Sequence, residues 1–174
     1  LLSRLTDETR RATAVLFADG AGAAVVVGSD TPGVGPVGWG SDGTQADVIT
    51  QTEDFRDAVP AGRMPTVYMD GKPVFRWATT FIADAARDIL KQTGIEPEQL
   101  DVFIPHQANN RITDSMLRHL KLPEHVVVAR SIKHFGNTSA SSIPIAMDEL
   151  LRSGEAHSGQ TALIIGFGAG LVYA

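Results

Sequence analysis

The chain has 174 residues, of which 43% are hydrophobic and 20% are charged, a composition typical of one globular domain with a substantial core. Its net charge of -5 argues against nucleic acid as the main partner, because phosphate binding requires clustered Lys and Arg side chains. The sequence has no Cys for disulfides or thiolate metal sites and no apolar run near the roughly 20 residues of a membrane span, so a cytoplasmic location is expected.

The first part of the chain combines apolar runs with a long segment rich in Gly, Pro and Asp. Residues 13–28, TAVLFADGAGAAVVVG, predict two strands joined by a tight turn over residues 19–22, where small residues permit close backbone approach. Residues 30–65 are too many for a simple connection. We expect short strands and a functional or covering loop there.

Apolar spacing in the rest of the chain alternates between helical and extended patterns. Helices are predicted over residues 73–93, 107–120 and 139–152, with Gly94 and Gly154 ending the first and the last. Strands are predicted over residues 100–105, 125–130, 161–167 and 171–174. This alternation indicates a layered α/β fold with a partly parallel sheet, and the continuous apolar strands indicate burial on both faces.

Polar side chains cluster where two of these strands lead into helices. PHQANN, residues 105–110, follows one strand, and HFGNTSASS, residues 134–142, follows the next. Proteins of the α/β class tend to bind ligands at the carboxyl ends of strands, and His106 could donate a hydrogen bond or exchange a proton near neutral pH. Helix capping by Asn, Ser and Thr is the alternative, and for the second cluster the local pattern favours it.

Two further motifs have ordinary structural interpretations. GFGAG, residues 166–170, lacks the following helix that a dinucleotide-binding loop requires, so we interpret it as a tight turn whose backbone N–H groups could stabilise an oxyanion. Arg111 and Arg118 lie on nearly the same helix face, which by itself indicates a solvated surface. The chain contains no GxSxG, HExxH or Walker-type motif, which removes support for the commonest hydrolase, protease and NTPase interpretations.

Taken together, five segments resemble the C-terminal half of β-ketoacyl-acyl-carrier-protein synthase III, a condensing enzyme. They are FADGAGAAVVVG, GKPVFRWA, IPHQANNRI, HFGNTSASSIPIAMDELLRSG and IIGFGAGLVYA, and the pairing of IPHQAN with GNTSAS is the specific part. The resemblance implies one half of the duplicated α/β/α/β/α thiolase-like fold, with a mixed five-stranded sheet and helices on both faces. It also implies that residues 1–174 form a C-terminal domain and that an N-terminal half, outside this chain, carries the nucleophilic cysteine.

The same resemblance implies roles for single residues. His106 and Asn137 match the family's catalytic histidine and asparagine, and the backbone N–H of Ala169 matches its oxyanion position. The other matched positions are the malonyl-site residue Asn109, the pantetheine-tunnel residues Gly71, Phe75 and Ala78, and the carrier-docking residue Arg111.

The implied activity is that of an acyltransferase that initiates fatty acid synthesis. It condenses an acyl-CoA primer with malonyl-acyl carrier protein to give 3-ketoacyl-acyl carrier protein, with no metal or other cofactor. The implied partners are acyl carrier protein, coenzyme A thioesters and a second copy of the complete chain in a homodimer. Two alternatives stay open: a starter-unit synthase or acyltransferase of a polyketide pathway, and a non-catalytic thiolase-like interaction subunit. We expect the 174 residues alone to be inactive, because they contain no cysteine.

Overall fold

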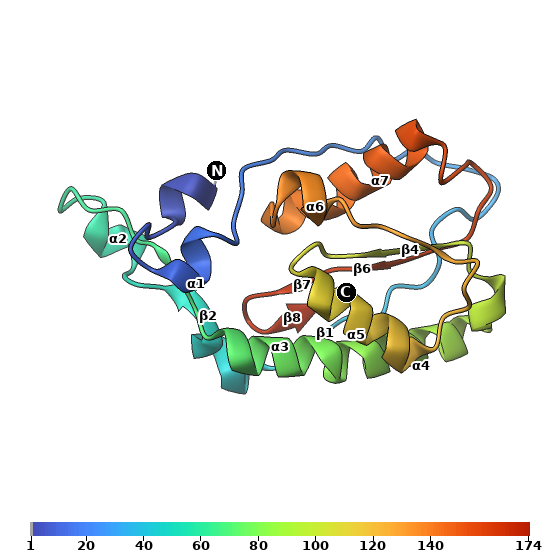
Figure 1. Cartoon of the computed structure of the whole chain (residues 1–174), viewed down its shortest axis with the longest axis horizontal. Helices are drawn as coiled ribbons and strands as arrows, with labels where there is room; N and C mark the ends of the chain where they lie inside the picture. Colours follow the sequence, from blue (N-terminus) through green and yellow to red (C-terminus); the bar gives the residue numbers. More distant parts are fainter. Residues whose placement is uncertain (1) are drawn as a thin grey trace.

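A mixed sheet forms the centre of the computed structural model, which describes residues 2–174 apart from the side chain of Ala12 (Figure 1). Strands β5 (Val127–Val128), β4 (Val102–Pro105) and β6 (Ala162–Ile165) pair in parallel in that order. After Gly166 the chain continues as β7 (Phe167–Gly168), which pairs antiparallel with β8 (Val172–Tyr173), and β8 pairs with β1 (Gly40–Ser41). The predicted α/β fold is therefore confirmed. In place of one five-stranded sheet, six strands form two three-stranded sheets, and the chain passes from one to the other at Gly166, between β6 and β7.

Helices cover both faces of this sheet. α3 (Gly71–Thr79), α4 (Phe81–Thr93) and α5 (Asn110–Leu120) lie on one side, and α6 (Ile132–Phe135) and α7 (Ser142–Ser153) on the other. Successive side chains of a strand point to opposite faces. Accordingly, Phe103 of β4 packs in the core formed with α3, α4 and α5, whereas Val102 and Ile104 pack in the core formed with α7. Two cores, one on each face, explain the continuous apolar sequence of β4.

The predicted helix over residues 73–93 starts earlier and is divided in two. It begins at Gly71, because the Asp70 carboxylate accepts a backbone N–H of the first turn at 3.3 Å. The break between α3 and α4 falls at Thr80, whose hydroxyl donates at 2.8 Å to a carbonyl one turn earlier, an interaction that often bends helices. α4 ends at Gly94 with φ +68°, as predicted.

The other two predicted helices are present and begin later than expected. α5 begins at Asn110 after the N-cap Asn109, and α7 follows a short 3-10 turn over residues 139–141. Only the middle of the predicted strand over residues 125–130 pairs, as β5, and α6 after it was not predicted. Within residues 2–174, no helix combines the length and the apolar character needed to cross a bilayer.

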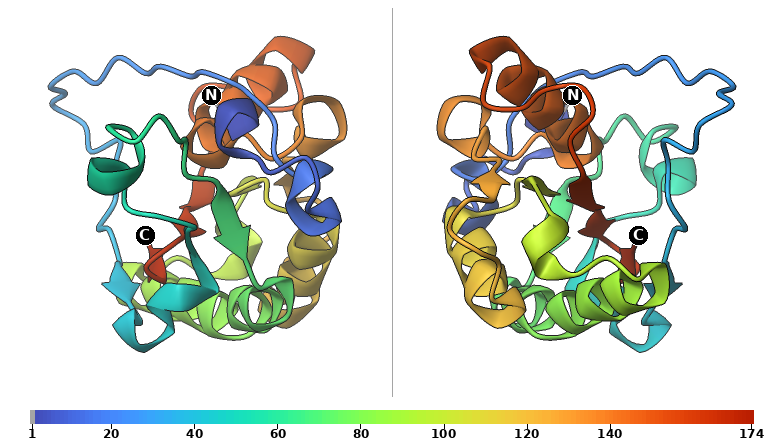
Figure 2. Two further views of the ribbon diagram at one scale, coloured as in Figure 1. Left: turned by 90° about the vertical axis from the view of Figure 1, so that its left-hand side faces the viewer. Right: turned by 90° about the vertical axis from the view of Figure 1, so that its right-hand side faces the viewer.

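The prediction of two strands over residues 13–28 is wrong. Residues 11–14 form the helical turn α1 (Arg11–Ala14), Phe17 makes a single bridge to Asn137, and residues 18–39 have no regular secondary structure. Figures 1 and 2 show the first part of this segment passing along the α7 side of the molecule, away from the sheet, before the chain descends to β1. Residues Val25, Val26 and Val27 are at least 75% exposed. β-branched residues favour strands where a neighbouring strand and a buried face exist, and the described residues provide neither for this segment.

Residues 30–65 do contain short elements, as predicted. In addition to β1, they form a 3-10 segment (Gly43–Val48), β2 (Ile49–Gln51) and α2 (Phe55–Ala58). β2 pairs antiparallel with β3 (Val67–Met69) in a separate two-stranded ribbon. This ribbon stands beside the carboxyl ends of β4 and β6 and forms one wall of the site described next.

Candidate active site

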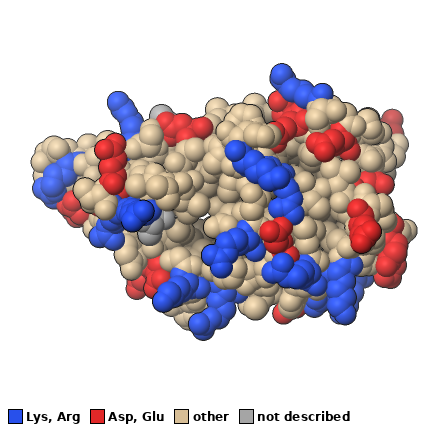
Figure 3. All heavy atoms as spheres, in the orientation of Figure 1, with Lys and Arg blue, Asp and Glu red and all other residues tan. Residues whose placement is uncertain are grey.

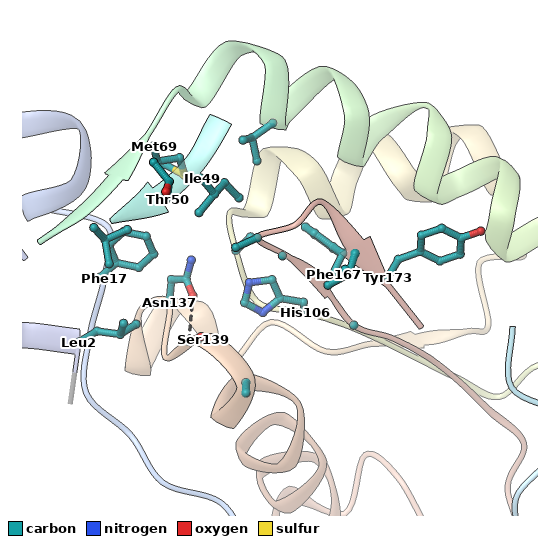
Figure 4. Close-up of a pocket in the computed structure, with 18 of the residues that line it drawn as sticks. Leu2, Phe17, Ile49, Thr50, Met69, His106, Asn137, Ser139, Phe167 and Tyr173 are labelled. Atoms are coloured by element: carbon teal, nitrogen blue, oxygen red, sulfur yellow. Dashed lines mark hydrogen bonds between the residues drawn. The ribbon is translucent and has the colours of Figure 1, made fainter. Parts of the chain in front are cut away.

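A cavity of about 1290 Å³ lies between the β2–β3 ribbon, the start of α7 and the β7–β8 hairpin (Figure 4). Its lining includes three residues that the sequence analysis assigned to catalysis: His106, Asn137 and Ala169. Much of the remaining lining is apolar and comes from separate elements, including Phe17, Ile49, Met69, Val74 and Phe167. The structure therefore brings the three candidate residues together in one largely apolar cavity.

His106 sits directly after β4, and several contacts hold its ring. Its backbone N–H donates to the Ile165 carbonyl at 2.7 Å, which extends the pairing of β4 with β6 by one residue. The Nδ1 atom lies 2.7 Å from Oγ of Ser142, and the ring packs edge-on against Phe167. Burial lowers the pKa of His106 to about 4, so the ring is neutral at pH 7. A neutral imidazole offers one N–H donor and one acceptor nitrogen.

Asn137 is held by its neighbours in the chain and by residues 16–18. Its backbone N–H donates to Leu16 at 3.2 Å, and its carbonyl accepts the N–H of Ala18 at 2.9 Å. The side-chain Oδ1 accepts the backbone N–H of Ser139 at 2.9 Å, and Ser139 has a left-handed φ of +55°. Figure 4 shows this bond and the carboxamide lying next to His106. With Oδ1 engaged, the NH₂ group is the hydrogen-bonding group that Asn137 offers to the cavity.

The glycine motif forms the predicted turn between two strands. Gly166 and Ala174 exchange backbone hydrogen bonds of 2.7 and 2.9 Å, and β7 and β8 pair between them and the turn. Ala169 lies in this turn and borders the cavity. The oxyanion role of its N–H stays a prediction.

The other predicted site residues lie outside the lining of this cavity. Asn109 caps α5 by accepting the backbone N–H of Arg111 at 2.9 Å, and Gly71 is the first residue of α3. The Arg111 guanidinium stands 5.6 Å from the centre of the Phe75 ring, a cation–π distance. Ala78 is fully buried in the core. The substrate and carrier-protein roles of these five residues remain predictions.

Sequence reasoning missed two buried polar residues beside His106. Ser142 and Gln107 are each 1% exposed, and the Gln107 side chain donates to the Pro105 carbonyl at 2.7 Å and accepts the N–H of Ile132 at 3.3 Å. For the second polar cluster the local pattern favoured helix capping, and Asn137 does accept the backbone N–H of Ser139, whereas Thr138 before the 3-10 turn and Ser141 before α7 make no side-chain cap bond. The run of serines was the available signal, but nothing local distinguishes the serine that faces His106.

Among residues 2–174, no group of three or more His, Asp or Glu side chains is placed to hold a metal ion.

The fold and this cavity define a thiolase-like α/β protein with two candidate hydrogen-bond donors in one largely apolar site. Solved structures have the same fold. The priming β-ketosynthase from the R1128 polyketide biosynthetic pathway superimposes with a TM-score of 0.93 and 46% identity, covering 99% of this chain and 52% of that one. The 3-oxoacyl-(acyl carrier protein) synthase III of Pseudomonas aeruginosa gives a TM-score of 0.80 and 32% identity over 99% of this chain and 54% of its own.

Sequence comparison identifies the family. Two models match: 3-oxoacyl-[acyl-carrier-protein] synthase III over residues 1–43 and the C-terminal part of the same enzyme over residues 90–174. The β-ketoacyl-[acyl-carrier-protein] synthase III of Streptomyces glaucescens is 56% identical over 99% of this chain and 53% of its own length, and a mycobacterial one from Mycobacterium avium is 46% identical. The chain belongs to the 3-oxoacyl-[acyl-carrier-protein] synthase III family and spans about half the length of the curated relatives it matches.

Proposed function

We propose that these 174 residues are the C-terminal half of a condensing enzyme that joins an acyl-CoA primer to malonyl-acyl carrier protein and releases 3-ketoacyl-acyl carrier protein, the first elongation step of fatty acid synthesis. The relatives named above and their family support this activity. The observation that carries the proposal is a half-buried, neutral His106 beside Asn137 in the wall of one largely apolar cavity.

The proposed reaction has two stages. A cysteine of the N-terminal half attacks the primer thioester, and coenzyme A leaves as the thiol, so that an acyl-cysteine forms. Malonyl-acyl carrier protein then loses CO₂, and the bonding electrons pass into an enolate on the carrier thioester. Its carbon attacks the acyl-cysteine carbonyl, and the cysteine sulfur leaves, which completes the new carbon–carbon bond.

His106 and Asn137 act on the decarboxylation step. As negative charge develops on the malonyl thioester oxygen, a ring N–H of His106 and the NH₂ of Asn137 donate hydrogen bonds to that oxygen. Preorganised donors aimed at developing charge contribute roughly 3 kcal/mol each. A neutral imidazole suits this role, because its N–H donates a hydrogen bond to the oxygen while the ring keeps its only proton. In the condensation step, the N–H of Ala169 stabilises the oxyanion on the former acyl-cysteine carbonyl.

The proposed partners follow from these substrates. The acyl carrier protein that serves this family is a negatively charged protein. It docks on the cationic surface around Arg111, at the start of α5. Figure 3 shows Lys and Arg side chains gathered over the α3–α5 side of the molecule. The complete chain pairs with a second copy, needs no metal or organic cofactor, and works in the cytoplasm, where coenzyme A thioesters are available.

The catalytic roles are tested in the protein expressed from its entire reading frame. His106→Ala and Asn137→Ala should each lower CO₂ release from malonyl-acyl carrier protein at least 100-fold. The control is His157→Ala, which removes an exposed imidazole and should leave the rate unchanged. Decarboxylation at the parent rate in either site variant would refute the role given to that residue.

The proposed N-terminal half has its own test. The coding sequence upstream of Leu1 should contain a cysteine codon at a strand-to-helix turn, and the 174-residue chain alone should form no ketoacyl product. An initiation codon immediately before Leu1 would contradict this part of the proposal.

Priming of a polyketide pathway is the second candidate function. It is favoured by the likeness to the priming β-ketosynthase of the R1128 pathway. Both candidates use the same condensation chemistry and differ in the primer and in the carrier protein that receives the product. Product analysis with the fatty acid and polyketide carrier proteins of the source organism, each loaded with malonyl, separates them by the preferred carrier.

A further inference from the structure

Ser142 is a buried polar residue at the first turn of α7 that the proposed reaction leaves without a role. It lies 36 positions after His106 in the chain, yet its Oγ atom is 2.7 Å from Nδ1 of His106. The same Oγ accepts the backbone N–H of Gln107 at 3.1 Å. In the described part of the chain these two groups are its hydrogen-bond partners, and the serine is 1% exposed.

The hydrogen-bonding capacity of these groups determines where the protons lie. The Gln107 N–H can only donate, so it occupies one lone pair of the Ser142 oxygen. If Nδ1 of His106 also donated to this oxygen, the hydroxyl proton of Ser142, a residue that is 1% exposed, would be left without an acceptor. A buried donor without a partner is unfavourable. The remaining arrangement satisfies every group: the hydroxyl accepts from Gln107 and donates to Nδ1.

We propose that Ser142 is a positioning residue that passes the backbone hydrogen bond of Gln107 on to Nδ1 of His106 and so keeps the single ring proton on Nε2. This inference rests on the proposed function, since it concerns the donor that His106 presents to the malonyl thioester. The contact between Ser142 and His106 resembles a neighbouring one. There the backbone N–H of Ser139 donates to Oδ1 of Asn137, which leaves the NH₂ group for the cavity. In both side chains, one contact within the protein takes the acceptor atom.

The position of the ring proton can be measured directly. The protein expressed from its entire reading frame is labelled with ¹⁵N-histidine, and the His106 signals are assigned by their loss in His106→Gln. The expected spectrum at pH 7 shows a proton on Nε2 and a proton-free Nδ1 that accepts a hydrogen bond. A proton on Nδ1 in the parent protein would overturn the proposal, whatever the variants do.

Ser142→Ala and the adjacent Ser141→Ala form a matched pair. The Ser141 hydroxyl is exposed and donates to the Gly20 carbonyl at 3.1 Å, so its removal does not touch His106. Ser142→Ala should move the Nδ1 signal toward that of an acceptor without a partner and lower malonyl decarboxylation about tenfold, through loss of the competent ring form. Ser141→Ala should change neither. An unchanged Nδ1 signal or parent decarboxylation rate in folded Ser142→Ala would overturn the proposal.

The two readouts also separate this inference from the proposed function. If the parent protein releases no CO₂ from malonyl-acyl carrier protein, the condensing activity is refuted, while the ¹⁵N spectra still report on the contact between Ser142 and His106. If the parent protein is active and the spectra show a proton on Nδ1, the role of Ser142 is refuted and the activity stands.

Discussion

The ring of His106 packs edge-on against the ring of Phe167, with centroids 5.1 Å apart and planes at 77°. His106 follows β4, whereas Phe167 begins the hairpin that carries Ala169. Phe167 also packs edge-on against Trp77 of α3, with ring centroids 6.3 Å apart. One aromatic side chain therefore connects the candidate donor, the candidate oxyanion turn and the helical layer.

Replacing this ring should weaken both stability and catalysis. Phe167→Leu removes two edge-on aromatic contacts, each contributing about 0.5–1.5 kcal/mol beyond buried area, so the free energy of unfolding should fall by about 1–3 kcal/mol. The decarboxylation rate should fall with it, because His106 loses a supporting surface. Phe135→Leu is the control: Phe135 is 46% exposed, and its replacement should change unfolding in urea by about 0.5 kcal/mol at most. Equal effects of the two changes would contradict this account.

Acid should destabilise the fold through His106. Its folded-state pKa of about 4 lies below the ordinary value of 6.5, so between these two pH values the unfolded chain binds a proton that the folded chain does not. The free energy of unfolding should therefore decrease as the pH falls through this window, by up to about 3 kcal/mol from this group.

The contribution of His106 is isolated by comparing pH dependences. Urea unfolding of the parent protein and of His106→Gln is followed from pH 7.5 to pH 4. Carboxyl groups titrate in both proteins, so the difference in slope belongs to the imidazole. The variant should show the shallower decline below pH 6.5. Parallel curves would mean that the folded protein protonates His106 as readily as the unfolded chain does.

Carrier-protein docking should depend on the charge at Arg111. Its guanidinium is positioned over the ring of Phe75 at the exposed start of α5. Arg111→Glu should raise the KM for malonyl-acyl carrier protein about tenfold or more at low salt, because charge reversal repels an acidic partner. The KM for malonyl-CoA, which needs no protein docking, should change little. Lys91→Glu makes the same charge change on α4 and should leave both KM values nearly unchanged; an equal effect there would indicate only a general loss of positive charge.

The position of the Asn137 side chain should depend on the glycine that precedes it in the chain. Gly136 has a left-handed φ of +68°, and a Cβ atom added there would lie 2.9 Å from the Ala18 side chain. Gly136→Ala should lower the free energy of unfolding by about 1–3 kcal/mol and displace Asn137, with loss of decarboxylation. Gly43→Ala is the matched control, since an added Cβ meets nothing within 4 Å and φ lies outside the left-handed region. Thermal melts and CO₂ release measure both effects, and a Gly136→Ala protein with parent stability would be the contrary result.

Several local features were predictable from the sequence because neighbouring residues determine them. Apolar spacing located the helices, Gly94 marked the end of α4, and the buried strand β4 was recognisable from its continuous apolar residues. His106 was recognisable because it follows β4 in a specific motif, whereas Asn137, which follows α6, was recognisable only through the family resemblance. The strand predicted over the exposed residues 25–27 was wrong because strand formation is not determined locally. Valine favours a strand only where a partner strand is available, and residues far along the chain supply that partner.

The sequence by itself determined the layered α/β architecture, the family resemblance and the identity of the candidate donors. Only the tertiary structure decided that His106 is half-buried and neutral, that Ser142 rather than Ser141 contacts it, and that His106 and Asn137 line one cavity. The physical reason is distance along the chain. Desolvation and hydrogen-bond partners are set by residues from separate elements, and these become neighbours only when β4, α7 and the glycine hairpin pack together.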